Sequence, residues 1–249
     1  MWNDPIRRTR GRRGYVAVLG GLSLFSFAAP SAAKDEAVNA VLFGSMDTGT
    51  SLFTSGGFKA APDRVDREGF AVLAVVGAGA RREQAPAAVN GTLPTLVRIT
   101  GLAALLGGYQ FFFDWGVLGL FAGPEGSVET LVGNGSFGAI ETRFGARLQG
   151  EVWARPSENT LTTVTLVMGS ARWDAYGRVS AGYRVLGAYL GPEAAAYADR
   201  TGYGRFSLGL HATDFGFGDF KFRVSGGYSY ERETERMGPY LSVAGWVPL

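Results

Sequence analysis

Cysteine is absent from this chain of 249 residues, and histidine occurs once, as His211. The lack of cysteine excludes a disulfide framework, a thiolate metal site and a cysteine nucleophile. A single histidine gives no basis for a histidine-rich metal site, so we expect no metal and no cofactor. Charged residues are also few, at 18% of the chain. A composition so poor in cysteine, histidine and charged residues is not that of an ordinary soluble enzyme.

Glycine and aromatic residues are abundant instead. The chain has 38 glycines and 13% aromatic residues, whereas glycine makes up about 7% of an average protein. Because glycine costs conformational entropy inside helices, a helical bundle is disfavoured. The mean hydropathy of +0.06 excludes disorder and is far below that of a polytopic helical membrane protein.

Residues 1–33 have the organisation of a secretory signal peptide. Five arginines within residues 7–13 precede an apolar stretch over residues 15–27, and the small residues Ser31 and Ala33 stand where signal peptidase cleaves. We therefore predict cleavage after Ala33. A retained anchor is the alternative, but its apolar stretch is shorter than the roughly 20 residues of a membrane span.

Removal of the leader reverses the sign of the net charge. Five basic residues and one acidic residue leave the totals of 24 and 22, so 19 and 21 remain and the net charge becomes −2. The remaining basic residues are spread singly among carboxylates, so we expect no nucleic-acid partner.

The remaining chain alternates apolar and polar residues with a period of two, which is typical of β-strands. Over residues 139–152, Phe144 and Leu148 share one face, while Arg143 and Arg147 share the other. The same alternation holds over three further segments, 175–185, 205–213 and 219–231. Turn clusters rich in glycine, asparagine, aspartate and proline separate the segments and indicate antiparallel strands.

The alternation and the turn clusters together predict about twelve strands. They lie near 40–46, 51–60, 69–81, 96–113, 117–127, 139–153, 160–171, 175–185, 187–198, 204–214, 219–231 and 239–248. A soluble barrel or sandwich and a membrane barrel both produce such alternation. Segments of about 10 to 14 residues with aromatic residues near their ends favour the membrane barrel, because soluble strands average about 5 to 6 residues. We therefore predict an all-β fold, a single antiparallel transmembrane β-barrel over residues 34–249.

The stretch from Thr100 to Gly123 contains a single charge, Asp114, and a transmembrane helix is its alternative reading. Its many glycines and the sequence Asp114-Trp115-Gly116 favour two strands joined by a tight turn. Lipid admits only helices and closed barrels, so a chain otherwise made of strands is expected to close its sheet.

Two motifs suggest chemistry. Residues 133–138 fit the pattern G-x-G-x-x-G, but alternation with a period of two follows, where a dinucleotide site needs a helix. His211 with Ser207 and Thr213 invites comparison with outer-membrane lipid hydrolases, which use a histidine base and a hydroxyl. The alternation places these side chains on the inward face, away from lipid. We therefore interpret His211 as a lumen histidine bonded to its neighbours, with no catalytic residue.

A short internal repeat places Gly-Pro-Glu at residues 123–125 and again at 191–193. Since proline cannot donate to a strand ladder, each Gly-Pro predicts a bulge or a strand end. In one interpretation Glu125 and Glu193 are lumen carboxylates that face Arg143, Arg147, Arg184 or Arg205. In the other, the strands end there and both glutamates lie in solvent.

If the polar faces point inward, they form a lumen network in which carboxylates pair with guanidinium groups. The predicted members are Glu125, Glu141, Arg143, Arg147, Glu151, Arg178, Arg184, Glu193, Arg205, His211 and Arg223. A barrel of twelve strands is wider than the eight-stranded kind that side chains fill completely. We therefore expect a constricted, partly wet interior.

Several segments resemble the cellulose biosynthesis protein BcsS family over nearly the whole predicted mature chain. The most specific are Gly-Pro-Glu-Ala-Ala at residues 191–195 and R-F-S-L-G-L-H at residues 205–211. Further matches lie at residues 42–44, 66–70, 107–110 and 226–228. The resemblance implies an outer-membrane barrel that accompanies a bacterial cellulose synthase system.

The resulting hypothesis is a monomeric, non-enzymatic barrel in the outer membrane of a Gram-negative bacterium, accessory to cellulose secretion. Its expected partners are outer-membrane lipid and either a cellulose exporter or the glucan itself. The alternatives are a small general pore or structural barrel and, from another class, a lipid hydrolase.

Overall fold

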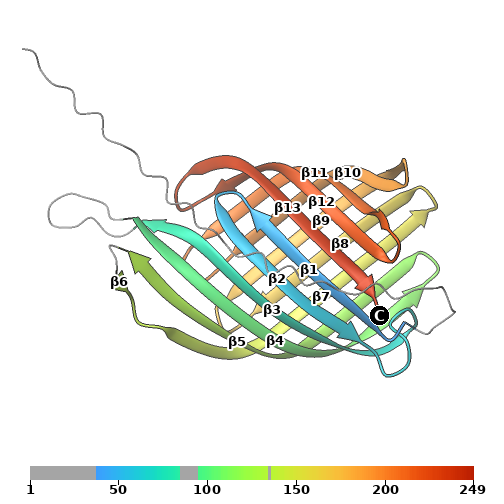
Figure 1. Cartoon of the computed structure of the whole chain (residues 1–249), viewed down its shortest axis with the longest axis horizontal. Coiled ribbons are helices and arrows are strands. Elements are labelled where there is room, and N and C mark those ends of the chain that lie inside the picture. Colours follow the sequence, from blue (N-terminus) through green and yellow to red (C-terminus); the bar gives the residue numbers. More distant parts are fainter. Residues whose placement is uncertain (1–37, 85–94, 134–135) are drawn as a thin grey trace, which may run out of the picture. The chain divides into compact units, whose positions relative to one another are not determined.

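The computed structural model describes residues 38–84, 95–133 and 136–249. The predicted signal peptide lies outside these residues, so its cleavage stays a prediction. The described part contains no helix that could span a membrane. It is instead made of antiparallel strands that lie side by side and tilted, as Figure 1 shows.

Twelve long strands and one two-residue strand make up the sheet. The long strands are β1 (Ala40–Thr48), β2 (Ser51–Ala60), β3 (Gly69–Gln84), β4 (Thr95–Phe113), β5 (Gly116–Gly133), β7 (Glu141–Ser157), β8 (Thr160–Gly169), β9 (Asp174–Val185), β10 (Ala188–Ala198), β11 (Gly204–Phe217), β12 (Phe220–Glu231) and β13 (Arg236–Pro248). The short strand β6 (Ser136–Phe137) pairs only with the end of β5.

The sheet closes because its first and last long strands pair. β1 lies antiparallel to β13, with Val41 opposite Pro248 and Thr48 opposite Leu241. The backbone N–H of Leu249 then donates to the carbonyl of Ala40 at 2.8 Å. Closure leaves no unpaired edge, which is the condition for a sheet to cross lipid.

The two ends of the barrel differ in their connections. β1 begins and β13 ends at one end, named here the terminal end, where four connections are two-residue turns at residues 114–115, 158–159, 186–187 and 218–219. A longer connection at this end, residues 61–68, turns inward: Val65 is buried, and its carbonyl accepts a hydrogen bond from Gln110 at 3.2 Å. The opposite end is named the distal end.

The predicted strand count is confirmed, and the strand bounds agree closely with the predicted segments. The helical reading of residues 100–123 is wrong, because β4 and β5 form a hairpin with Phe113 opposite Gly116. The largest difference is β5, which continues to Gly133 where the sequence predicted an end near residue 127.

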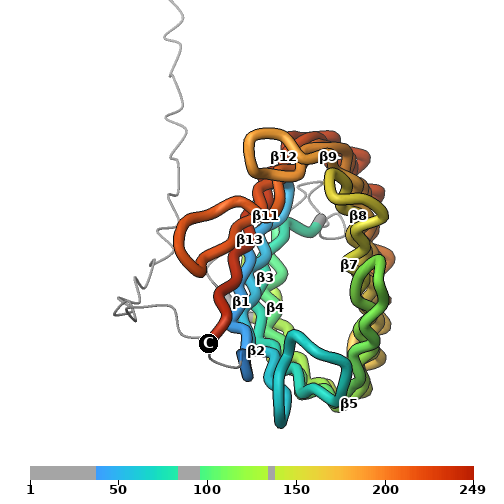
Figure 2. The backbone as a smooth tube through the Cα atoms, turned by 90° about the vertical axis from the view of Figure 1, so that its right-hand side faces the viewer, coloured from blue at the N-terminus to red at the C-terminus, as the bar shows by residue number. Residues whose placement is uncertain are grey.

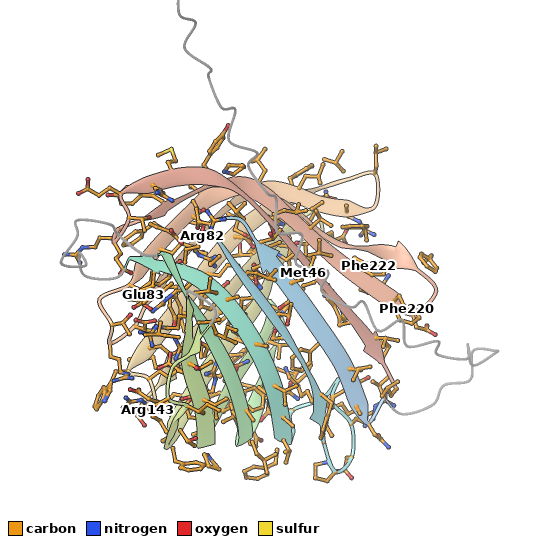
Figure 3. The ribbon with its side chains drawn as sticks, turned by 60° about the vertical axis from the view of Figure 1, so that its left-hand side comes forward. Met46, Arg82, Glu83, Arg143, Phe220 and Phe222 are labelled. Carbon is orange, nitrogen blue, oxygen red and sulfur yellow. The ribbon has the colours of Figure 1, made fainter. Side chains whose placement is uncertain are left out.

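The outward face of the barrel is apolar. Phe144 is 84% exposed, and Val76, Leu148 and Leu208 are also exposed. Aromatic rings gather at the terminal end, where Phe113 stacks on Trp115 with ring centroids 4.9 Å apart. Figure 3 shows Phe220 and Phe222 toward this end and Arg82, Glu83 and Arg143 toward the other. An exposed apolar belt with an aromatic border is typical of a lipid-facing barrel surface.

The barrel has a flattened cross-section, with β1–β4 on one long side and β7–β9 on the other (Figure 2). Side chains from opposite sides therefore approach each other within the lumen. Lys59 on β2 reaches Glu151 on β7 at 2.8 Å, although β3, β4 and β5 separate these strands in the sheet.

Candidate functional site in the barrel lumen

The lumen encloses a cavity of about 640 Å³ between side chains of the inward face. Its lining combines aromatic rings, including Phe53, Phe112 and Tyr176, with charged groups. Side-chain contacts cross the lumen at three levels.

The terminal end is narrowed by aromatic and charged contacts. Trp153 on β7 meets Trp246 on β13 edge to face, with ring centroids 5.5 Å apart. One level deeper, Lys59 bonds Glu151, which also accepts from Gln149 at 2.7 Å. Since β7 and β13 are not neighbours in the sheet, the two tryptophans close part of the opening between opposite walls.

A buried charge pair lies at the middle level. Arg223 on β12 pairs with Glu193 on β10, and both side chains are almost fully buried. Ser225 donates to Glu193 at 3.0 Å, and Arg223 reaches across to Thr163 on β8 at 3.0 Å. A buried ion pair survives when further hydrogen bonds satisfy its remaining polar groups, as they do here.

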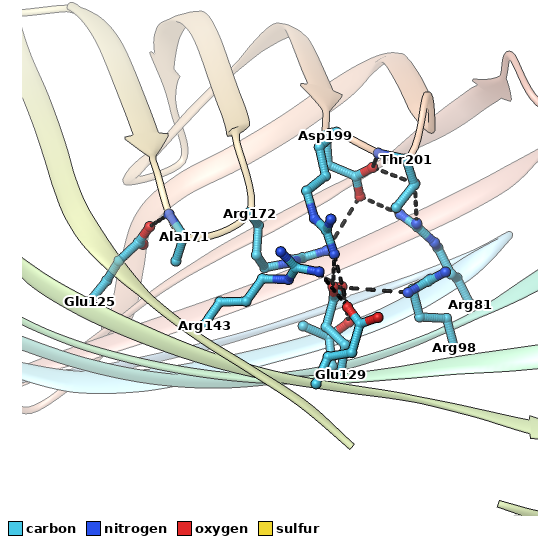
Figure 4. Close-up of polar contacts among 12 residues, drawn as sticks. Arg81, Arg98, Glu125, Glu129, Arg143, Ala171, Arg172, Asp199 and Thr201 are labelled. Carbon is cyan, nitrogen blue, oxygen red and sulfur yellow. Dashed lines mark hydrogen bonds and ion pairs between the residues drawn. The ribbon is translucent and has the colours of Figure 1, made fainter. Parts of the chain in front are cut away.

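The distal end holds the largest charge network (Figure 4). Arg81 on β3 bonds Asp199 at 2.6 Å, and Arg172 lies 3.3 Å from the same carboxylate. Arg172 also lies 3.1 Å from Glu129, which has Arg98 at 3.9 Å. These groups belong to β3, β4, β5 and two connections, so the network ties opposite walls together.

Asp199 and Tyr203 lie in the connection after β10, outside the strands, and their pKa values are shifted in opposite directions. Burial acts to raise the pKa of Asp199, but hydrogen bonds from Thr201 and Arg81 outweigh it, and the pKa falls below its ordinary value. Burial, aided by the hydrogen bond to Glu231, raises the pKa of Tyr203 to about 12. The Tyr203 phenol therefore stays protonated and donates to Glu231 at 2.6 Å.

Neither Gly-Pro-Glu repeat forms a bulge or ends a strand, so both of those expectations are wrong. The register is the same on either side of Pro124 within β5 and of Pro192 within β10. Each proline lacks a backbone N–H to donate to the neighbouring strand, but the strand register does not shift. Both glutamates that follow, Glu125 and Glu193, are buried in the lumen.

The predicted partners of these glutamates are correct in one case. Glu125 lies 3.2 Å from Arg147 and also accepts from the backbone N–H of Ala171 at 2.9 Å. Glu193 pairs with Arg223, which was not among the arginines expected to face it. The reason is that Arg223 is two strands away and spans the width of β11.

His211 compensates for the missing donor of Pro192. The register places Pro192 opposite Ala181, and the carbonyl of Ala181 lies 3.3 Å from His211 Nε2. His211 Nδ1 lies 2.7 Å from the Thr213 hydroxyl. The ring passes over Gly182, where a Cβ atom would come within 3.1 Å of it. A side chain at position 182 would therefore press on the histidine ring, which glycine leaves free to reach across.

The other predicted lumen residues divide between the interior and the rim. Arg178 and Arg205 line the cavity, and Arg205 donates to Ser51 at 2.9 Å. Glu141 and Arg143 form a pair at the distal rim at 2.5 Å, where the Glu141 side chain is 54% exposed. Arg184 is exposed, with its guanidinium carbon 5.9 Å from the ring centroid of Tyr189, so it lies outside the buried network.

Several central charges of the distal network were not predicted, namely Arg81, Arg98, Glu129, Arg172 and Asp199. For two of them the sequence did contain a signal, namely their place in the alternation of inward and outward residues. Arg81 continues the inward face of Leu73 and Val75, and Glu129 continues that of Glu125. Arg172 and Asp199 lie in connections, where a period of two gives no information.

Part of the inward face is apolar rather than charged. Leu73 on β3 and Leu106 on β4 are opposite each other and fully buried, and Phe121 on β5 packs with them. Lys59 lies 5.2 Å from the Phe121 ring centroid, within the range of a cation–π contact. Among the described residues, no cluster of histidine, aspartate and glutamate could hold a metal ion.

These features define a transmembrane β-barrel of twelve long strands with a lumen that is crossed by side chains. The chain belongs to the cellulose biosynthesis protein BcsS family, which matches residues 41–249. No curated protein sequence matches it.

Solved structures of similar fold include two kinds of barrel. A KdgM porin in complex with disordered oligogalacturonate has 10% identity and a TM-score of 0.45, over 84% of this chain and 99% of that chain. The translocator domain of the autotransporter NalP from Neisseria meningitidis has 15% identity and a TM-score of 0.45, over 85% of this chain and 89% of that chain.

Proposed function

We propose that this chain is a non-enzymatic outer-membrane accessory of bacterial cellulose biosynthesis and secretion. The observation that carries the proposal is the extent of the family match, which covers the barrel from β1 to the last residue. The match is therefore to the whole barrel and not to one motif. The apolar outward belt supports a place in the lipid bilayer.

The lumen favours an accessory role over export of the polymer. Contacts between opposite walls cross it at the terminal, middle and distal levels, as Trp153–Trp246, Arg223–Thr163 and Arg81–Asp199 show. A glucan chain that passed along the cavity would have to break the terminal and distal contacts, since Trp153, Trp246 and Arg81 line it. We infer that cellulose leaves through another protein and that this barrel acts beside it.

The environment of His211 supports a role without catalysis. Both ring nitrogens already have partners, Thr213 and the Ala181 carbonyl, and the ring is buried away from the lipid face. A lipid hydrolase needs a histidine that activates a hydroxyl within reach of lipid. His211 has the surroundings of a group that completes a strand ladder.

The connections suggest the orientation. Outer-membrane barrels have short turns on the periplasmic side and longer loops outside. The start of β1, the end of β13 and four two-residue turns all lie at the terminal end. We therefore place the terminal end in the periplasm and the charged distal end at the cell surface. There the barrel, acting as a monomer, would meet the exporter or the emerging glucan.

Deletion of the gene tests the role in cellulose production. We expect extracellular cellulose, measured by a cellulose-binding dye, to fall, while outer-membrane integrity and growth stay normal. Re-expression of the wild-type chain and of His211→Ala should both restore the dye signal. Unchanged cellulose after deletion would refute the proposal, and failure of the His211→Ala chain alone, at equal barrel content, would favour the enzyme.

Planar-bilayer recording tests the crossed lumen. We expect the purified wild-type chain to give no large, steady conductance, because side chains close the terminal and distal levels. The double variant Trp153→Gly/Trp246→Gly should conduct more, since it removes the aromatic contact at the terminal end. A large conductance in the wild-type chain would instead support the general pore.

A further inference from the structure

The lumen cavity contains polar groups that the protein itself leaves without partners. In the described part of the chain, neither the guanidinium of Arg178 nor the carboxylate of Asp47 makes a hydrogen bond or an ion pair, and both line the cavity. The Nε atom of Arg178 is buried without any partner. Such groups are costly unless something else satisfies them, and water or a ligand is the usual answer.

Eight cations and four carboxylates line the cavity, and four further carboxylates lie just behind the lining. Six of its eight cations each have a carboxylate within 4 Å, as the pairs Lys59–Glu151, Arg81–Asp199, Arg98–Glu83, Arg147–Glu125, Arg155–Asp214 and Arg172–Glu129. The remaining two, Arg178 and Arg205, face a lining that also contains Asp47 and Asp174. With the paired carboxylates behind the lining, Glu83, Glu125, Glu129 and Asp199, included, eight cations face eight carboxylates. No excess charge is then left to attract an ion, and the cavity suits an uncharged ligand with many hydroxyl groups.

Aromatic rings also contribute to the lining of the cavity. Phe43, Phe53, Phe112, Trp153 and Trp246 all border the cavity. Rigid aromatic faces bind the apolar C–H face of a sugar ring, while charged and phenolic groups bond the hydroxyls at its edge. The volume of about 640 Å³ lies in the range of roughly 300–1,000 Å³ that is usual for small-ligand pockets.

We propose that the lumen cavity is a binding site for a short uncharged oligosaccharide, held by stacking on lumen aromatic rings and by hydrogen bonds to Arg178, Asp47 and Tyr176. The inference rests on the proposed function only for the choice of first probe, a β-1,4-linked glucan oligomer. The site binds and holds the sugar and does not conduct it, because the contacts at both ends of the cavity remain in place.

Tryptophan fluorescence gives a direct readout, because Trp153 and Trp246 border the cavity whereas Trp115 and Trp173 are exposed on the outside. The full chain carrying Trp2→Phe, Trp115→Phe and Trp173→Phe is purified in a detergent without a sugar headgroup and titrated with cellotetraose. We expect a saturable change in emission, and calorimetry on the wild-type chain should give the same Kd. Trigalacturonate, an anionic oligomer, should give no change.

Two lumen variants and one matched control locate the site. Arg178→Gln should weaken cellotetraose binding by about tenfold or more, because it removes a charged hydrogen-bond donor. Tyr176→Phe removes only a hydroxyl from the same strand and should weaken binding by less. Tyr228→Phe makes the same change on the outward face, where Tyr228 is exposed, and should leave the Kd unchanged.

Three results would overturn the inference: no binding of cellotetraose, tighter binding of trigalacturonate, or an equal loss with Tyr228→Phe. If Arg178→Gln does not fold, Tyr176→Phe carries the comparison. The gene deletion separates this inference from the proposed function. Binding without a cellulose defect would refute the proposed function alone, and a cellulose defect without binding would refute the lumen site alone.

Discussion

Two parts of the lumen wall, β3–β5 and β10–β12, bury different kinds of side chain. The inward face of β3–β5 buries an apolar cluster around Leu73, Leu106 and Phe121. The inward face of β10–β12 instead buries the pair Glu193–Arg223 with the hydroxyls around it. Around these residues one wall is held by packing and the other by a charge pair and hydrogen bonds, whereas the charges of β3–β5 lie further along, at the distal end.

The difference shows how a flattened barrel can be filled without a plug domain. Apolar side chains on one wall exclude water from part of the lumen, and the other wall pairs its buried charges, Glu193 with Arg223. A few long side chains cross the lumen: Lys59 on β2 reaches Glu151 on β7, and Arg81 on β3 reaches Asp199 after β10. The cavity is the space that these crossings leave open.

Removing a partner from the polar wall should have the largest effect. Glu193→Ala leaves Arg223 buried and unpaired, and we expect a loss of about 3–5 kcal/mol in the free energy of unfolding. Urea-driven unfolding from lipid vesicles measures it. Glu141→Gln at the exposed distal rim is the control and should cost far less, because solvent screens an exposed ion pair. If Glu193→Ala and Glu141→Gln cost the same free energy of unfolding, the buried pair does not stabilise the polar wall.

In the apolar wall, the substitution expected to be destabilising is one that leaves a cavity. Leu106→Ala should cost about 2–5 kcal/mol in the same assay, since Leu106 is fully buried and its neighbours are rigid strands. Leu105→Ala is the matched control on the adjacent residue, whose side chain is 55% exposed on the outward face. A cost at Leu105 as large as that at Leu106 would show that the apolar cluster is not a packed core.

The outward and inward faces of one strand give a third test. Leu148→Arg on β7 should cost about 2–4 kcal/mol near the middle of the bilayer, because a charge there faces lipid. Gln149→Arg, one residue further, points into the lumen and should cost little. Leu208→Arg on β11 should behave like Leu148→Arg. Equal effects at Leu148 and Gln149 would refute the barrel and favour a sheet with solvent on both faces.

The contrast between the walls also explains which parts of the site the sequence predicts. On β7, β9, β11 and β12 one face is polar, so a period of two separates lumen from lipid and identifies residues such as Arg147 and Arg223. On β3–β5 both faces are apolar near the terminal end, as Leu73 inside and Val72 outside show. There the pattern predicts a strand but not which face is inside.

The partners of the lumen charges needed the three-dimensional structure. The pair Glu125–Arg147 lies on neighbouring strands and follows from the strand order. The contacts Arg81–Asp199 and Lys59–Glu151 span the lumen, and they depend on the flattening of the barrel. Nothing in the local sequence encodes that flattening, so these pairs could not be derived from alternation.

The smallest effect is expected where the two walls meet at Asp199. Its pKa is lowered from 3.8, because the bonds from Thr201 and Arg81 outweigh burial. A group with a lowered pKa contributes stability that is complete above its unfolded value and is lost as the pH falls through the folded value. We therefore expect the free energy of unfolding of the wild-type chain to decline as the pH falls below 3.8. The Asp199→Asn chain should be less stable at neutral pH, and its free energy of unfolding should change less over the same pH range. If its pH dependence equals that of the wild-type chain, other carboxylates are responsible for the decline.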